Sequence, residues 1–191
     1  MSKERIDNLK NKIEQYLNES NINNIKLIQQ WDKIIEIADI IKNSNQVFLC
    51  GNGGSSSTAS HFTNDLQKMC GLKAFCLTDN VPVITAYAND SSYDYIFEYQ
   101  LQTLASKNDT LIVISGSGNS QNIYNAVIEA IWHDMNIITF VGMDGGKLMK
   151  NITEGINYVH IESDMQHSED WHLTLCHLIV ALIKREKEEV K

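Results

Sequence analysis

Residues 48–57 read FLCGNGGSSS and residues 111–120 read LIVISGSGNS, and these two stretches decide the fold. In each, an apolar run typical of a buried strand ends in a turn of small residues, and a helical pattern follows, at 58–69 and at 121–132. A helix N-terminus presents unpaired N–H groups and a partial positive charge, which attract phosphate. Glycines let the backbone approach the anion, and serine hydroxyls add donors. The two turns therefore predict a pocket for a phosphorylated small molecule.

The chain from residue 46 onward continues this alternation of short apolar runs and helical segments. We expect strands at 46–50, 73–77, 110–114, 136–141 and 158–161. We expect helices at 58–70, 81–88, 95–106, 120–133, 145–151 and 167–188. The pattern predicts an α/β fold, a three-layer α/β/α sandwich around a parallel sheet of about five strands. Ligands of such sheets bind beyond the carboxyl ends of the strands, where both turns lie.

Residues 3–44 read as helical throughout, with a break expected at 18–24, a segment rich in Asn and Ser. The second apolar stripe, over residues 25–41, is too apolar for a lone surface helix. We expect it to pack on the domain or on a neighbouring subunit. We therefore read the chain as a single domain over 1–191, with N-terminal helices at 1–44 and an α/β core with its C-terminal helix at 45–191.

Composition narrows the class of protein. The 191 residues are 43% apolar and 21% charged, as in soluble globular proteins. Neither a membrane-spanning stretch nor a signal peptide is recognisable, which favours a cytoplasmic protein without a membrane partner. A net charge of −8 argues against a nucleic-acid partner. Four cysteines without a C-x-x-C pair predict buried, reduced thiols, with a catalytic cysteine as the alternative: Cys50, Cys70, Cys76 and Cys176.

Two helical segments carry residues suited to chemistry. His61 and Asp65 are four residues apart and share a helix face, and the last helix carries Glu169 and His177. Two imidazoles and two carboxylates suit a divalent ion such as Zn²⁺, and equally suit acid–base work on a sugar carbon. An i,i+4 His/Asp pair is also common as a local hydrogen bond. Glu169 and His177 are separated by a rise of roughly 12 Å, so they reach one ion only by leaning together or across subunits.

Several segments together resemble the sugar-isomerase (SIS) superfamily and, within it, the sedoheptulose-7-phosphate isomerase, or phosphoheptose isomerase, family. The resemblance extends over nearly the whole chain, and the segments keep the family's order and spacing. They are residues 51–55, His61-Phe62, residues 88–90, residues 115–120, Gly145-Gly146-Lys147, and the Glu-Asp-x-His-x4-His segment at 169–177.

The resemblance implies a homotetramer with active sites between subunits and one zinc ion per subunit. It also implies conversion of D-sedoheptulose 7-phosphate to D-glycero-D-manno-heptose 7-phosphate through an enediol, for nucleotide-activated heptoses of surface polysaccharides. The implied substrate contacts are Asn52, Gly53, Gly54, Asp65, Asn89, Asp90 and Glu169, with Ser115, Gly116, Ser117 and Ser120 holding the phosphate. His61, Asp65, Glu169 and His177 fall on the zinc positions, and Asp65 and His177 on the base and the acid.

Two positions depart from the familiar members of the family. Asp65 stands where a glutamate is usual, and Glu169 stands where a glutamine is usual. These departures keep two alternatives open: an isomerase of another sugar phosphate, or a non-catalytic SIS protein of the DnaA initiator-associating type. Lys147, next to Gly145-Gly146, is interpreted as a surface residue at a helix start.

Overall fold

The structure, a computed structural model, describes residues 3–189. Its helices are α1 (Lys3–Ile28), α2 (Trp31–Lys42), α3 (Gly54–Lys68), α4 (Val81–Asp90), α5 (Glu98–Leu104), α6 (Gln121–Trp132), α7 (Gly146–Asn151) and α8 (Met165–Glu189), with a short 3₁₀ turn, η1, at Tyr93–Tyr95. Its strands are β1 (Val47–Gly51), β2 (Ala74–Cys76), β3 (Thr110–Ser115), β4 (Asn136–Val141) and β5 (Ile156–His160).

The five strands form one parallel sheet in the order β2-β1-β3-β4-β5. The strand order reverses between β1 and β3, and such a switch point is where open α/β sheets bind their ligands. The two Gly/Ser turns follow β1 and β3, so both turns lie at this switch point.

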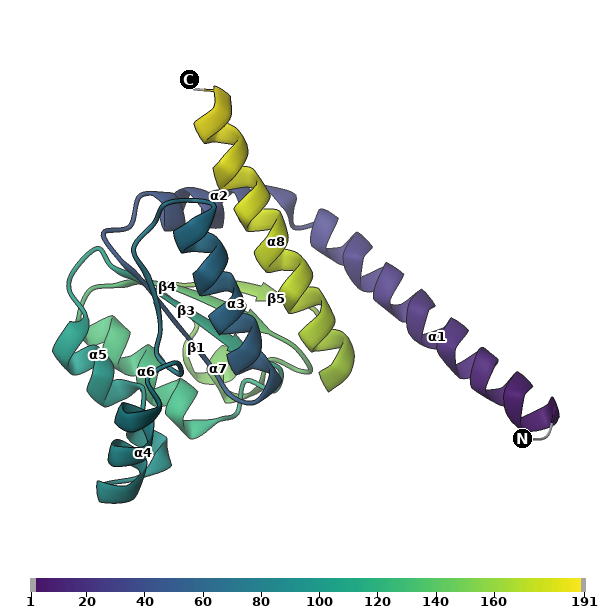
Figure 1. Ribbon diagram of the computed structural model, residues 1–191, viewed down its shortest axis with the longest axis horizontal. Coiled ribbons are helices and arrows are strands. Elements are labelled where there is room, and N and C mark those ends of the chain that lie inside the picture. Colours follow the sequence, from purple (N-terminus) through teal and green to yellow (C-terminus); the bar gives the residue numbers. More distant parts are fainter. Residues whose placement is uncertain (1–2, 190–191) are drawn as a thin grey trace.

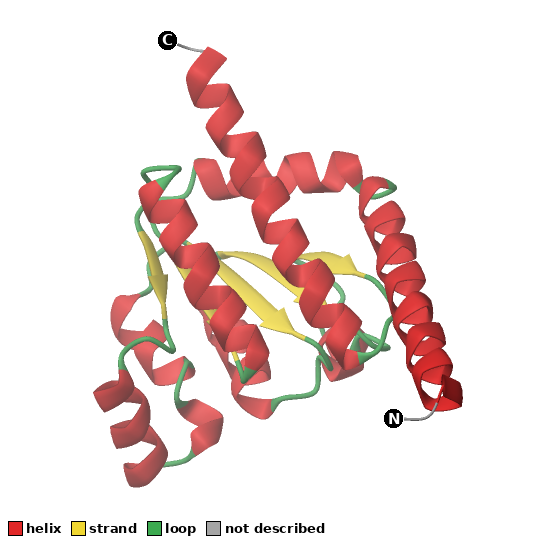
Figure 2. Cartoon of the chain, turned by 45° about the vertical axis from the view of Figure 1, so that its right-hand side comes forward, coloured by secondary structure: helices red, strands yellow, loops and turns green. Residues whose placement is uncertain are grey.

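Helices cover both faces of the sheet, which confirms the three-layer architecture (Figure 2). α2, α3 and α8 pack on one face, and α5, α6 and α7 pack on the other. Along β1, Val47 and Leu49 belong to the first core, whereas Phe48 belongs to the second. Burial on both sides explains why the strands read as continuous apolar runs rather than as alternating patterns.

Several boundaries differ from the sequence prediction. The helix expected at 95–106 is divided into η1 and α5, and β5 spans Ile156–His160 rather than 158–161. Two further differences concern the N-terminal helix and the first turn. The expected break at 18–24 is wrong, since α1 continues to Ile28 and the chain turns at Gln29 and Gln30. Asn and Ser are only weak helix breakers, and the buried side chains of Asn23 and Leu27 keep this segment helical. The second difference is that α3 begins at Gly54 rather than at residue 58, because the serines form its first turn.

α1 extends away from the body of the molecule (Figure 1). Its first turns carry exposed apolar side chains, among them Leu9, Ile13 and Leu17. Within the described residues, no helix is long and apolar enough to cross a membrane. All four cysteines are buried and free, as predicted.

Candidate active site

The second turn, after β3, is stabilised by hydrogen bonds between its own backbone and its serine hydroxyls. The N–H of Gly118 donates to the Ser115 hydroxyl at 3.0 Å, and the N–H of Asn119 donates to the Ser117 hydroxyl at 3.3 Å. Each hydroxyl thus accepts a bond from the loop and keeps its own proton to donate. Gly118 has a φ of 63°, which favours glycine at this position.

The helix that follows this turn lacks an N-terminal cap. Ser120, the residue before α6, makes no capping hydrogen bond with its side chain. The N–H of Ile123 donates to the Asn122 side chain at 2.9 Å, so it is the N–H groups of Gln121 and Asn122 that lie beside serine hydroxyls free to donate. Uncapped N–H groups and hydroxyl donors at one turn form the arrangement that binds phosphate.

The first turn, after β1, is joined to the second by a pair of amides. Asn52 and Asn122 exchange two hydrogen bonds of 2.9 Å, and the hydroxyl of Tyr93 donates to Asn52 at 2.9 Å. Asn122 and Tyr93 are site residues that the sequence analysis missed. Their role depends on the meeting of β1, η1 and α6, for which the sequence gives no local signal.

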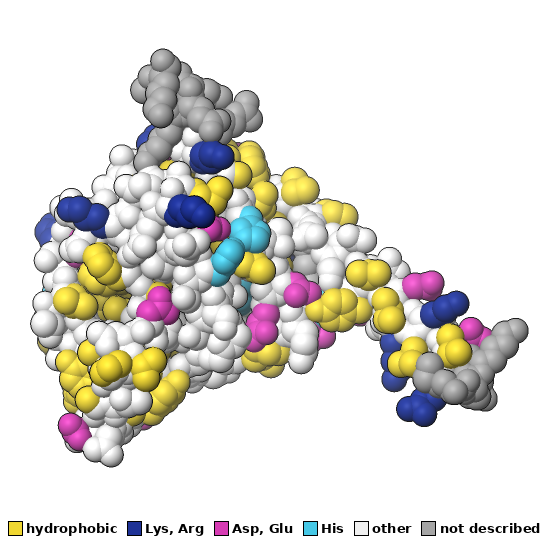
Figure 3. Space-filling view, in the orientation of Figure 1, with side chains coloured by type: hydrophobic (Ala, Val, Ile, Leu, Met, Phe, Trp, Pro, Cys, Tyr) yellow, Lys and Arg dark blue, Asp and Glu magenta, His cyan; other side chains and the backbone are white. Residues whose placement is uncertain are grey.

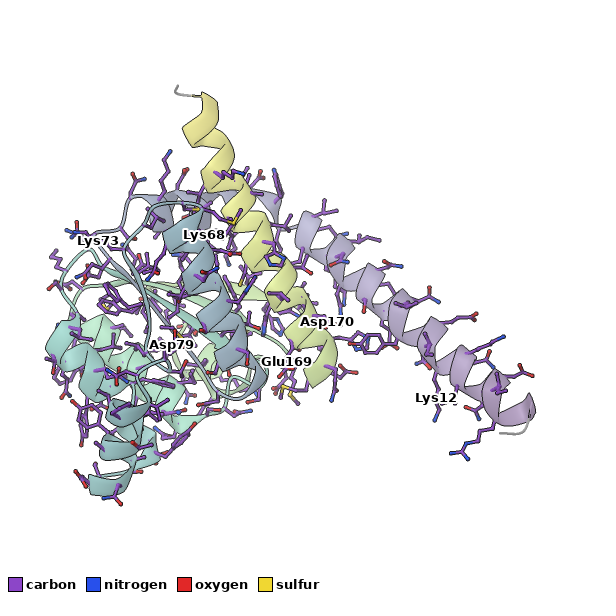
Figure 4. All side chains as sticks on the ribbon, in the orientation of Figure 1. Lys12, Lys68, Lys73, Asp79, Glu169 and Asp170 are labelled. Carbon is purple, nitrogen blue, oxygen red and sulfur yellow. The ribbon has the colours of Figure 1, made fainter. Side chains whose placement is uncertain are left out.

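A carboxylate of the protein itself lies against the N-terminus of α3. A Cβ atom on Gly54 would overlap the Glu169 carboxylate, so this carboxylate lies directly against the backbone of Gly54. Figure 4 shows Glu169 on α8, beside the loop end of α3. An acidic side chain is stabilised at the positive end of a helix. In this chain, the partial positive charge at the first turn therefore already faces an anion.

His61, Asp65 and His177 converge on one point. The Nε2 atoms of His61 and His177 lie 3.1 Å apart, and Nε2 of His61 lies 3.5 Å from Oδ2 of Asp65. One ligand atom from each residue lies within 4.8 Å of the others. Both histidines are exposed while Asp65 is buried, and histidine side chains reach the surface over α3 and α8 in Figure 3.

The geometry of this group fits a divalent ion. Two imidazole nitrogens bound to one tetrahedral Zn²⁺ lie about 3.3 Å apart, close to the spacing found here. Without an ion, the same two nitrogens can share a single N–H···N hydrogen bond. The predicted fourth ligand, Glu169, lies at Gly54 instead of in this group, because it is eight residues from His177 along α8.

Two further predicted contacts, Asn89 and Asp90, lie exposed at the end of α4. The amide of Asn89 donates to the Asp90 carboxylate at 2.7 Å. Among the described residues, neither forms a hydrogen bond with either turn.

Burial disfavours two of the cysteines as nucleophiles. Burial raises the pKa of the Cys50 and Cys176 thiols above the usual range, so both stay protonated at neutral pH. The fold and the second turn define an α/β domain of the class that binds its ligands at the switch point of the sheet.

Comparisons with known proteins agree with this class. The SIS domain model matches residues 9–142. The chain is 38% identical over 161 residues to a phosphoheptose isomerase from Aliarcobacter butzleri, over 81% of this chain and 84% of that protein. A phosphoheptose isomerase from Helicobacter pylori is 34% identical over 154 residues, over 78% and 79% of the two chains.

Solved structures give the same result. The structure of a phosphoheptose isomerase from Francisella tularensis superimposes with a TM-score of 0.86 at 30% identity, over 92% of this chain and 97% of that one. That from Neisseria gonorrhoeae superimposes with a TM-score of 0.83 at 28% identity, over 93% and 99%. The chain therefore belongs to the SIS domain family and, within it, to the phosphoheptose isomerases.

Proposed function

We propose that this chain interconverts D-sedoheptulose 7-phosphate and D-glycero-D-manno-heptose 7-phosphate through an enediol. Besides family membership, one observation carries the proposal: Asp65 and two imidazoles converge on one point in a chain that offers an open phosphate-binding turn. The product would supply nucleotide-activated heptoses for surface polysaccharides. The four free, buried cysteines suit the reducing cytoplasm.

Asp65 and His177 take the proton-transfer roles in this proposal. Asp65 removes a proton from the carbon next to the carbonyl, and His177 gives a proton to the carbonyl oxygen, which yields the enediol. A proton then returns to C2, the former carbonyl carbon, and the C1 hydroxyl loses its proton, which gives the aldose. The phosphate held by Ser115, Gly116, Ser117 and Ser120 fixes the far end of the sugar, so the reacting carbons stay in register with the two groups.

Zn²⁺ is the proposed cofactor, held by His61, Asp65 and His177. When bound, the ion supplies Lewis-acid polarisation of the carbonyl. Glu169 would complete the ligand set only if the start of α8 moved toward the other three residues. In this proposal, Asp65 serves both as a ligand of the ion and as the base. Its short side chain and the added charge of Glu169 therefore affect how metal binding and proton transfer are divided among these residues.

A site completed by a second copy of the chain suits these distances. Along α3, Asp65 lies roughly 16 Å beyond Gly54, where the first turn opens into the helix. An extended chain of seven carbons with a phosphate spans roughly 10 Å. One sugar therefore contacts the first turn and Asp65 together more readily when the two come from different subunits. The exposed apolar side chains of α1 offer a surface for the proposed tetramer.

The test is a nuclear magnetic resonance assay with D-sedoheptulose 7-phosphate in D₂O. The proposal expects an aldose product with deuterium incorporated at the carbon that exchanges its proton. Product from another sugar phosphate alone would make the chain an isomerase of that sugar. No product from any member of a sugar-phosphate panel, with or without added Zn²⁺, would favour a non-catalytic SIS protein.

A further inference from the structure

Lys147 is fastened to the rim of the second turn. The N–H of Lys147 donates to the Asn119 side chain at 3.0 Å, and the next N–H, of Leu148, donates to the Gly118 carbonyl at 3.0 Å. A Cβ on Gly146 would overlap the backbone of Ser117 and Gly118, so the start of α7 touches the loop directly. The backbone of Lys147 therefore moves with the turn.

The ammonium group of Lys147 is held without a counterion. Its Nζ donates to Oε1 of Gln121 at 2.6 Å and lies 5.5 Å from the centre of the Tyr124 ring. Among the described residues, no carboxylate lies within ion-pair distance of this nitrogen. By contrast, Lys150, one turn away, pairs with Asp144 at 2.7 Å.

The position of this cation runs against local electrostatics. Gln121 is the first residue of α6, so the Lys147 ammonium lies at the positive end of that helix, where cations are disfavoured. The side chain as a whole is half-buried, and its hydrogen bond to Gln121 is exposed to solvent. Local rules are broken in this way mostly at functional sites. An anion bound in the turn would stabilise both the helix end and the ammonium.

We propose that Lys147 is the cation of the phosphate site. Residues 115–120 contain no charged side chain, so the loop alone offers only neutral donors to a dianion. Lys147 adds the positive charge, and it thereby sets a preference for phosphate monoester dianions over groups of lower charge. The nature of the sugar rests on the proposed function, whereas the recognition of the anion does not.

A calorimetric titration of the protein with inorganic phosphate tests this role. Lys147→Met should weaken phosphate binding roughly tenfold or more, as expected when a charged hydrogen-bond partner is lost. The KM for sedoheptulose 7-phosphate should rise by a similar factor while kcat stays within about twofold, and the dependence of KM on salt should flatten. Lys147→Arg should restore most of the affinity. Lys150→Met, the matched control, should leave phosphate binding unchanged.

A second variant neutralises the charge of Lys147 by pairing it with a carboxylate, without removing the lysine. Gln121→Glu places a carboxylate against Nζ of Lys147 at a helix position that favours an acid, so the fold should be kept. Phosphate binding should again weaken by roughly tenfold. Unchanged phosphate affinity in both folded variants would overturn the inference even if the enzyme isomerises its substrate. Conversely, Lys147-dependent phosphate binding without isomerisation would leave the inference standing and overturn the proposed function.

Discussion

The two Gly/Ser turns look alike in sequence, yet the structure gives them different electrostatic surroundings. At the first turn, the N-terminus of α3 faces the Glu169 carboxylate, and Asn52 is bound to Asn122 and Tyr93. At the second turn, Ser120 leaves α6 uncapped, and the nearby Lys147 has no carboxylate partner among the described residues. The first turn therefore lies beside an anionic side chain of the protein, whereas the second lies beside a lysine without an anionic partner.

This difference teaches that a small-residue turn before a helix identifies an anion position but not its occupant. At the first position, the carboxylate of Glu169 from α8 lies beside the helix end, and Asn52 joins this turn to Asn122. The second position is left for a ligand. The substrate phosphate should therefore bind at residues 115–120, and the first turn should contact the uncharged part of the sugar.

The largest expected effect lies outside both turns, at Asp65. It tests whether proton transfer and phosphate binding belong to separate parts of the site. Asp65→Asn should lower kcat by at least about 100-fold, because a general base contributes on the order of 10²–10⁴-fold. Inorganic phosphate should bind the variant as it binds the wild type, since the second turn is unchanged. Near-normal turnover by a folded variant would remove Asp65 from the base role.

The second test compares the turns directly. The double variant Ser117→Ala/Ser120→Ala should raise KM by roughly 10- to 100-fold, because two donors to a charged group are lost. The matched change in the first turn, Ser56→Ala/Ser57→Ala, should move KM by less than about twofold. Steady-state kinetics on the two variants suffices, and equal effects on KM would end the distinction between the turns.

The third test loosens the helix that anchors the first turn. His172 of α8 is fully buried, neither ring nitrogen has a partner among the described residues, and burial lowers its pKa to about 3. Between pH 6.5 and about 3, the unfolded chain takes up a proton that the folded chain refuses. The free energy of unfolding should therefore fall by about 1.4 kcal/mol per pH unit, or about 2 kcal/mol at pH 5.

Urea titrations at pH 7 and pH 5 measure this loss. His172→Phe should remove most of the part of this loss that is due to His172. The unfolding free energies of the variant at pH 7 and pH 5 should therefore differ less than those of the wild type. His133→Gln, at a partly exposed histidine paired with Glu129, serves as the control. An equal pH response in wild type and His172→Phe would mean that the buried ring is protonated in the folded state.

The smallest expected effect concerns the internal anion. Glu169→Gln should lower the free energy of unfolding by about 0.3–1 kcal/mol at low salt, because a carboxylate at a helix N-terminus is lost. Urea titrations at low and high salt provide the measurement, and the difference from wild type should shrink as salt rises. A variant as stable as the wild type at low salt would show that Glu169 does not serve the end of α3.

Much of the fold was predictable because parallel strands are buried on both sides. Runs such as residues 111–114 are apolar without alternation, and Gly, Asn or Ser precedes α3, α4, α6 and α7. The end of α1 was not predictable in this way. The helix runs through an Asn-rich segment because Asn23 and Leu27 pack inside, and that packing is a tertiary effect.

The site was predictable only where its parts are local. The serine turn and the His61–Asp65 pair follow from spacing along the chain. The location of Glu169 depends on how α8 crosses the start of α3, and the Asn52–Asn122 pair depends on the meeting of two loops. Lys147 was interpreted as a surface residue, because its missing counterion becomes visible only in three dimensions.

A crystal structure with D-sedoheptulose 7-phosphate bound is the most direct measurement. It should show the phosphate within hydrogen-bonding distance of the Ser117 and Ser120 hydroxyls, with Glu169 still against Gly54. A phosphate at the N-terminus of α3, with Glu169 displaced, would contradict the assignment of the two turns.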